Sequence, residues 1–116
     1  MGQLPELSEA NFGEQVTSAR GVVVVDFSAQ WCGPCRTVAQ VIAEVAEQYN
    51  GKVKVGNVDV GKDSRLATRF GVAMIPTVLF FKDGKVAGQL VGTVSKQRIV
   101  DRIEQLLSDP RRGGGH

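Results

Sequence analysis

Residues 22–35 read VVVVDFSAQWCGPC, and this stretch decides how the chain is expected to fold. The run 22–27 is apolar on both faces apart from Asp26, which predicts a central strand covered by helices. After it, apolar residues recur at spacings of four, three and four, on one face of a helix: Val38, Ile42, Val45 and Tyr49. Cys32 and Cys35, the only cysteines in the chain, therefore lie where a buried strand gives way to a helix.

The remaining elements follow from the same kinds of pattern. Three helices are expected behind serine N-caps: one from Ser8, one over 64–70 capped by Ser64, and one from Ser95. Three further strands are expected where β-branched and aromatic residues gather: 53–60, 77–81 and 86–91. Gly56 is a candidate β-bulge, and Asp83-Gly84 predicts a hairpin turn.

The predicted order is α-β-α-β-α-β-β-α. The first two strands are joined through a helix, so they should lie parallel by a right-handed crossover. The hairpin then adds an antiparallel edge. The expected fold is α/β, with a central mixed β-sheet flanked by helices on both faces. We expect one domain over residues 1–108 and a disordered, polar, glycine-rich tail over 109–116.

In the last helix, apolar residues at helical spacing are expected to face inward: Ile99, Ile103, Leu106 and Leu107. In the first helix, Phe12, Val16 and Ala19 should share one face.

Charge and composition exclude several classes of protein. The 116 residues carry a formal charge of +2 with scattered basic residues, which argues against nucleic acid or an anionic membrane as a partner. No stretch approaches the roughly 20 apolar residues that span a bilayer, and residues 1–9 lack the features of a secretory signal. We therefore expect a cytoplasmic protein, in which a disulfide is transient and catalytic rather than structural.

Several motifs occur in an order and spacing that resemble the thioredoxin family. They are Asp26-Phe27, Trp31-Cys32-Gly33-Pro34-Cys35, Ile75-Pro76-Thr77, Asp83-Gly84-Lys85 and Gly92. The resemblance extends from about Glu6 to Leu107. Together the pentapeptide and the later triplet are far more specific than a C-x-x-C pair alone. The resemblance implies a thioredoxin fold and a thiol-disulfide oxidoreductase that serves electron transport and cell redox homeostasis.

The two cysteines are expected to have unequal roles. Cys32 would lie at the exposed N-terminus of a helix, where free N–H groups and the helix dipole stabilise a thiolate. Cys35 lies one turn inside and should be more buried. Cys32 would attack a substrate disulfide, and Cys35 would then resolve the mixed disulfide. A structural staple closing so small a loop stabilises little. A zinc site lacks ligands, because the only histidine is His116.

Asp26 is a carboxylate within an apolar strand, where burial should raise its pKa. A lone aspartate there is most simply a strand-end carboxylate that reaches solvent. The resemblance implies instead that Asp26 is the general base that deprotonates Cys35.

Pro76 precedes a β-rich run, where proline ordinarily marks the start of a strand. The resemblance implies more: a cis bond between Ile75 and Pro76, packed against the dithiol, with the Ile75 backbone open to pairing with a substrate segment. It also implies a flat apolar docking patch around Cys32. The patch is expected to comprise Trp31, Gly33, Pro34, Ile75, Pro76 and Gly92.

The resemblance further implies the partners of the reaction. They are protein disulfides and a flavin-containing thioredoxin reductase that passes on electrons from NADPH. No bound cofactor or metal and a monomeric state are expected. The rivals are an oxidase or isomerase on the same fold, which Gly33-Pro34 disfavours, and a binding module without turnover, which the intact dithiol disfavours.

Three residues depart from the family pattern. Ser28 replaces an aromatic residue, which could loosen the packing near Asp26. Asn57 replaces a lysine near the buried carboxylate, so the pKa of Asp26 should rise further without that cation. Gln40 replaces a proline that kinks the long helix, so this helix should be straighter. A near match to a P-loop at 56–63 is set aside, because Asp63 stands where Ser or Thr would bind magnesium.

Overall fold

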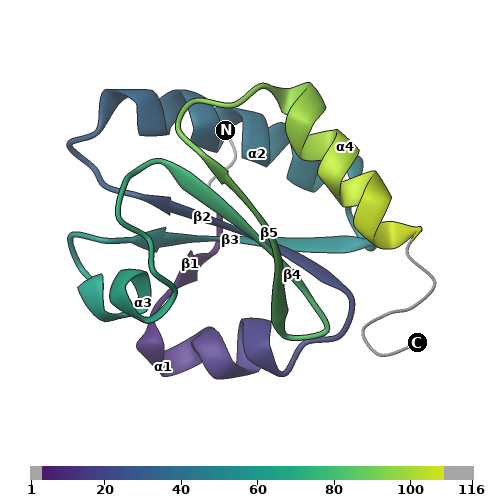
Figure 1. Cartoon of the computed structure of the whole chain (residues 1–116), viewed down its shortest axis with the longest axis horizontal. Coiled ribbons are helices and arrows are strands. Elements are labelled where there is room, and N and C mark those ends of the chain that lie inside the picture. The colour runs from purple at the N-terminus through teal and green to yellow at the C-terminus, as the bar shows by residue number, and fades with distance from the viewer. Residues whose placement is uncertain (1–3, 109–116) are drawn as a thin grey trace.

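The computed structural model describes residues 4–108 as a mixed sheet between two layers of helices (Figure 1). The predicted α/β class is confirmed, and the predicted tail 109–116 lies outside the described residues. In chain order the elements are β1 (Glu6–Leu7), α1 (Glu9–Phe12), the π-helical turn η1 (Gly13–Thr17), β2 (Val22–Ser28), α2 (Gly33–Gln48), β3 (Val53–Asp59), α3 (Ser64–Arg69), β4 (Thr77–Lys82), β5 (Lys85–Val91) and α4 (Lys96–Leu107).

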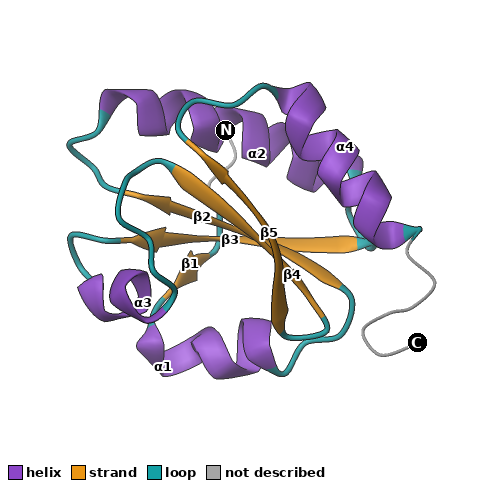
Figure 2. Cartoon of the chain, viewed as in Figure 1, coloured by secondary structure: helices purple, strands orange, loops and turns teal. Residues whose placement is uncertain are grey.

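The sheet has the order β1-β3-β2-β4-β5. As predicted, β2 and β3 are parallel, and the β4–β5 hairpin is antiparallel. Strand β2 is central, so Asp26 lies opposite Asn57 of β3 on one side and Val78 of β4 on the other. The ends of β2 and β3, the start of β4 and the end of β5 meet at the left of Figure 2, where α2 begins.

Two apolar cores lie on opposite faces of the sheet. Val22 and Val24 of β2 pack in the core that contains the buried residues of α4 and those of α2 from Val38 onward. Val23, Val25 and Phe27 pack in the other core, with α1, η1 and α3. Successive strand residues face opposite sides, so Asp26 and Ser28 share the α2 side with Val24. The strand therefore places a carboxyl group where its sequence would otherwise continue the core.

Local signals at the helix ends account for where α2 begins and ends. Cys32 is the N-cap, and its sulfur accepts a hydrogen bond from the Cys35 amide. Pro34 occupies the first turn, where its missing N–H removes no helical bond. The chain leaves the helix at Tyr49 and turns at Gly51, whose φ is 90°. The predicted caps Ser8 and Ser95 are confirmed for α1 and α4.

Several predictions about the elements are wrong. Gly56 is not a bulge, because β2 and β3 pair without a shift through this position. The irregularity lies instead in the β4–β5 hairpin, between Phe80 and Phe81. Ser64 is the first residue of α3 and not its cap; Asp63 precedes it and makes no side-chain capping bond there. Asp63 accepts a hydrogen bond from the Glu9 amide at the start of α1, at 2.8 Å.

Three further details differ from the predictions. The two-residue strand β1 was not predicted. Leu107 is 37% exposed rather than turned inward, although Ile99, Ile103 and Leu106 are buried as expected. The strand expected at 53–60 ends at Asp59. The predicted turn at Asp83-Gly84 is confirmed, with φ of 51° and 85°, the left-handed pair that a tight hairpin requires.

Candidate functional site

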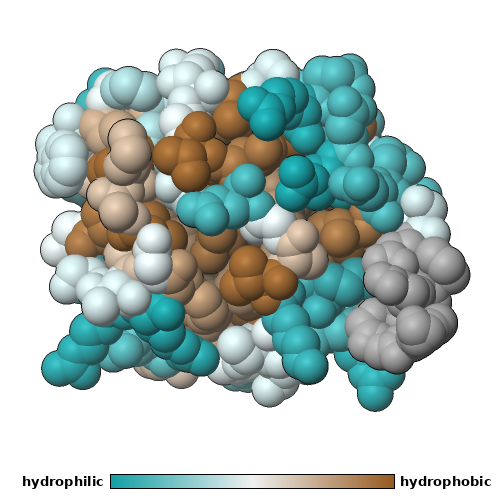
Figure 3. Space-filling model, viewed as in Figure 1, coloured by the Kyte–Doolittle hydropathy of each residue, from teal (hydrophilic) through white to brown (hydrophobic). Residues whose placement is uncertain are grey.

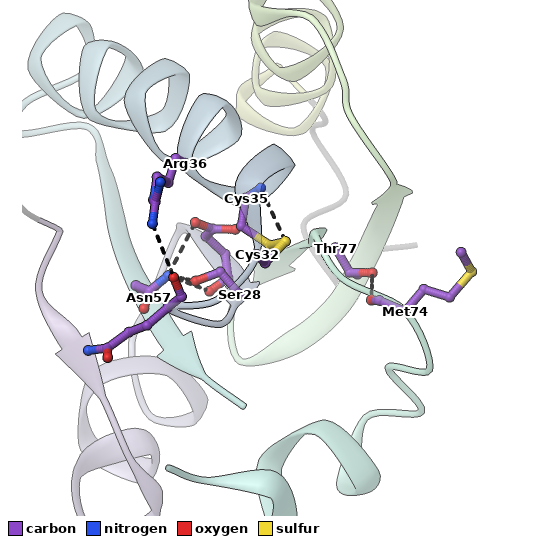
Figure 4. The surroundings of a disulfide bond; sticks show 9 residues. Ser28, Cys32, Cys35, Arg36, Asn57, Met74 and Thr77 are labelled. Atoms are coloured by element: carbon purple, nitrogen blue, oxygen red, sulfur yellow. Dashed lines mark hydrogen bonds between the residues drawn. A yellow bond between two sulfur atoms is a disulfide. The ribbon is translucent and has the colours of Figure 1, made fainter. Parts of the chain in front are cut away.

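Cys32 and Cys35 form a disulfide at the start of α2, with their Cα atoms 5.3 Å apart. The Cys35 amide donates a hydrogen bond to Cys32 Sγ at 3.3 Å (Figure 4). Cys32 is 7% exposed and Cys35 is 2% exposed. The predicted order of burial is confirmed, but Cys32 itself is buried in this disulfide form. The exposed part of the helix start is formed by Gly33 and Pro34.

The residues around the disulfide combine a small apolar cluster with an open rim. Ala29 lies in a buried cluster with the two cysteines, and Val60 and Ile75 pack against it. Trp31, in contrast, is 75% exposed. It is therefore a surface aromatic beside the disulfide and not a core residue.

The bond between Ile75 and Pro76 is cis, as expected. The Gly92 amide donates to the Pro76 carbonyl at 2.8 Å, so the segment after β5 is held beside the cis peptide. Thr77 Oγ1 donates to the Met74 carbonyl at 2.6 Å and closes the turn before β4. Figure 4 places Thr77 and Met74 on one side of the disulfide and Ser28 and Asn57 on the other.

Apolar side chains remain exposed on this part of the surface. Met74 is 63% exposed and Val91 is 49% exposed. Figure 3 shows apolar residues gathered over the left and middle of the face in view, whereas the surface over α4 is mostly hydrophilic. Sequence reasoning did not include Met74 or Val91 among the site residues. Their positions next to Ile75 and Gly92 were the available signal.

Asp26 is fully buried. Burial raises the pKa of its carboxyl group from 3.8 to about 7, and a hydrogen bond from Asn57 opposes this rise. The simpler interpretation, a strand-end carboxylate in solvent, is therefore wrong. Among the described residues, Oδ1 of Asp26 has no hydrogen-bond partner. A carboxyl group that titrates near neutral pH is suited to accept and return a proton.

Ser28 and Asn57 form a polar cluster with Asp26. Asn57 Nδ2 lies 2.7 Å from Ser28 Oγ, 3.2 Å from Asp26 Oδ2 and 3.2 Å from the Asp26 carbonyl oxygen. Sequence reasoning treated Ser28 and Asn57 as separate departures and missed that they bind each other. The parallel register of β2 and β3 was the signal, because it sets Asn57 opposite Asp26.

The three departures from the family pattern share one surface cleft. Ser28, Gln40 and Asn57 all line a cleft of about 800 Å³ between α2 and the β1–β3 edge of the sheet. Asp26 itself does not line this cleft and stays fully buried. Helix α2 runs without interruption past Gln40 from Gly33 to Gln48.

Other kinds of site find no support in residues 4–108. This part of the chain has no group of three or more His, Cys, Asp or Glu side chains placed to hold a metal ion. The same residues include no helix with the length and apolar character needed to cross a membrane.

Comparison with known proteins relates the whole arrangement to one family. The family model described as Thioredoxin matches residues 3–105. The chain is 40% identical over 107 residues to Thioredoxin of Synechocystis sp. (strain ATCC 27184 / PCC 6803 / Kazusa), covering 92% of this chain and 100% of that protein. It is 37% identical to Thioredoxin 1 of Nostoc sp. (strain PCC 7120 / SAG 25.82 / UTEX 2576), with the same coverage.

A plant protein is similar over a comparable length. Thioredoxin M-type, chloroplastic, of Spinacia oleracea is 38% identical over 106 residues, which is 91% of this chain and 59% of that protein. The family match extends from before β1 into α4. It therefore includes both cysteines, Asp26 and Pro76.

Proposed function

Because the chain belongs to the thioredoxin family, whose members are thiol-disulfide oxidoreductases, we propose that it works as a reductant of protein disulfides. Its Cys32–Cys35 pair is the dithiol–disulfide redox centre. The observation that carries the proposal is the position of this pair at the N-terminus of α2, with Cys32 as the N-cap. There the free N–H groups and the helix dipole favour the thiolate form of Cys32.

The reaction proceeds in two exchanges. The Cys32 thiolate attacks one sulfur of a substrate disulfide, forms a Cys32–substrate disulfide and releases the other substrate sulfur as a thiolate. The Cys35 thiolate then attacks Cys32 Sγ, forms the Cys32–Cys35 disulfide and releases the second substrate thiolate. In total, two electrons and two protons pass from the dithiol to the substrate.

Asp26 is the proposed base for the second exchange. Its side chain lies on the face of the sheet that α2 covers, and α2 carries Cys35. Since burial raises its pKa to about 7, the carboxylate can take the Cys35 proton near neutral pH and later release it. Oδ1, which has no hydrogen-bond partner within residues 4–108, is the proposed atom for this transfer.

Substrates are proposed to dock on the surface beside the disulfide. The exposed rim of Trp31, Gly33 and Pro34 adjoins the cluster that contains Ile75. The Gly92–Pro76 hydrogen bond aligns the neighbouring segment. An extended substrate segment can then pair with the backbone of Ile75 while the apolar rim takes its side chains.

Re-reduction is assigned to a flavin-containing thioredoxin reductase that uses NADPH. Gly33-Pro34 between the cysteines supports a reductant rather than an oxidase or isomerase, as the family resemblance implies. We place the protein in the cytoplasm as a monomer. Fractionation of its source cells and sedimentation of the purified chain test these two statements.

Insulin reduction tests the main proposal. The oxidised protein with reductase and NADPH, or with dithiothreitol, should accelerate insulin precipitation well above the uncatalysed rate. Cys32→Ser should remove the acceleration. Cys35→Ser should instead accumulate a mixed disulfide with insulin that is visible on a non-reducing gel. No acceleration by the wild-type protein would refute the proposal. A redox potential more oxidising than that of glutathione would favour the oxidase.

A further inference from the structure

One amide group at the β2–β3 pair faces more acceptors than it can fully satisfy. The Asn57 side-chain amide has two N–H donors. Three oxygen atoms lie within hydrogen-bond distance of its nitrogen: Ser28 Oγ at 2.7 Å, and Oδ2 and the carbonyl oxygen of Asp26, each at 3.2 Å. The short contact occupies one N–H with Ser28. The two oxygens of Asp26 are left to share the other.

We propose that Ser28 and Asn57 are a pair of positioning residues for Asp26, in which Ser28 competes for the Asn57 amide and so sets how firmly the carboxyl group holds its proton. The proposal rests on the proposed function only where it concerns catalysis, through the role of Asp26 as base. The proton affinity of Asp26 can be measured without any turnover.

The surroundings of Asp26 make its proton affinity depend strongly on the Asn57 amide. Among the described residues, Asn57 is the only hydrogen-bond partner of the carboxyl group, because Oδ1 has none. Hydrogen bonds to the charged form lower a carboxyl pKa, whereas burial raises it. The amide is thus the one specific contact that opposes the rise in the pKa of Asp26 caused by burial.

Charged groups are nearby but do not bind the carboxyl group. On β4 the residue opposite Asp26 is the buried Val78. On α2, Cys35 is in the disulfide and does not titrate in this form. Within residues 4–108, the charged side chains that share the cleft with Ser28 and Asn57 are Glu6 of β1, Arg36, Glu44 and Glu47 of α2, Asp59 of β3 and Lys62. None of these six side chains makes a hydrogen bond to the Asp26 carboxyl group, whereas the neutral Asn57 amide does.

The location of the pair makes it testable by substitution. Ser28 and Asn57 are half-buried and line the cleft, whereas Asp26 lies behind them. Substituted side chains at these two positions would face the open cleft, and neither position belongs to an apolar core. Gln40 lines the same cleft without a hydrogen bond to Asp26, and it provides a matched control.

The test is a titration of Asp26 in the oxidised protein, followed by the ¹³C chemical shift of its carboxyl carbon. Ser28→Ala should free an N–H for Asp26 and raise its acid dissociation constant about tenfold. Asn57→Leu, which removes the amide but keeps the volume, should lower that constant by a similar factor. In the Asn57→Leu background, Ser28→Ala should have no effect, because no amide is left to compete for. Ser28→Thr keeps a hydroxyl group at this position, so its titration should match that of the wild-type protein. Gln40→Ala should also leave the titration of Asp26 unchanged.

Specific outcomes would refute the proposal that Ser28 competes with Asp26 for the Asn57 amide. Shifts of the same sign in Ser28→Ala and Asn57→Leu, or an effect of Ser28→Ala that persists without the amide, would refute the competition. A second measurement separates this from the proposed function: the pH dependence of mixed-disulfide resolution in a single turnover. If the titration moves as expected and the rate profile stays fixed, the pair stands and the role of Asp26 as base fails.

Discussion

Asp26 holds a carboxyl group inside the sheet with one oxygen unpaired among the described residues. Such a group opposes folding whenever it is charged, since burial penalises the ionised form. The chain keeps it in the central strand, next to four valines that could have continued as a fifth. The proton transfer to and from Cys35 proposed above supplies a reason for this arrangement.

This carboxyl group predicts how stability depends on pH. The pKa of Asp26 is about 7 in the folded protein, against 3.8 ordinarily. Between these values the native state binds more protons than the unfolded state, so stability should fall as pH rises from about 4 to about 7. Asp26→Asn should therefore stabilise the oxidised protein at pH 8 by up to about 4 kcal/mol. Near pH 4 the gain should be close to zero.

Urea unfolding of both proteins at the two pH values measures this difference. Asp101→Asn, which changes an exposed carboxylate on α4, is the control and should keep the wild-type dependence of stability on pH, because Asp26 is still present. Equal pH dependence in wild type and Asp26→Asn would show that Asp26 does not carry a raised pKa.

At the scale of elements, helices, strands and turns were predicted correctly where the residue pattern that specifies them lies within one segment. The strand β2, the helix α2 and the Asp83-Gly84 turn each carry their pattern locally. The failures depend on distant partners. Strand β1 has only two residues and exists because it pairs with Asn57 and Val58 of β3. The Asn57–Ser28 contact likewise joins two strands separated by a helix.

Gly56 shows the same dependence on a distant partner. It was predicted to be a bulge because a glycine interrupts the valines of β3. Its actual role is to leave space for Leu7: a Cβ at Gly56 would lie 2.5 Å from Leu7 Cδ1. No pattern within β3 specifies the approach of a leucine from β1.

Gly56→Ala should therefore destabilise the protein by about 1–3 kcal/mol, through overpacking against Leu7. In a Leu7→Ala background the same change should have a much smaller effect, because the obstructing side chain is gone. A double-mutant cycle from urea unfolding measures the coupling. Gly13→Ala, whose Cβ would meet nothing nearer than 3.7 Å, is the matched control. Additive effects of Gly56→Ala and Leu7→Ala would contradict the clash.

At the scale of the whole molecule, the site forms where three separate segments meet. The segments around Cys32, Pro76 and Gly92 come together at one end of the sheet (Figure 1). The family resemblance identified residues from all three in the sequence. Their exposure could not be obtained in this way, because it depends on how the segments cover one another; the burial of Cys32 is an example.

A comparison within β5 tests the docking surface. Val91 lies at the site end of the strand and Val86 at the hairpin end, and their exposed fractions are nearly equal at 49% and 50%. Val91→Lys should raise KM for insulin several-fold with little change for a small aromatic disulfide, because only the protein substrate spans the docking surface. Val86→Lys should change neither the KM for insulin nor the KM for the small disulfide. Steady-state kinetics with both substrates measures this, and equal effects of the two substitutions would place docking elsewhere.

The two outer strands of the sheet have a consequence for self-association. Long, flat, unpaired edges invite strand-to-strand growth between molecules. Here β1 is only two residues long, and the part of β3 that β1 leaves unpaired carries the exposed Lys54. On the other side of the sheet, Ala87 of β5 has no partner residue on β4, so the strand is irregular there. None of these edges offers another molecule a long regular template. A protein whose sheet has such edges can thus accumulate in a crowded solution without polymerising through its sheet.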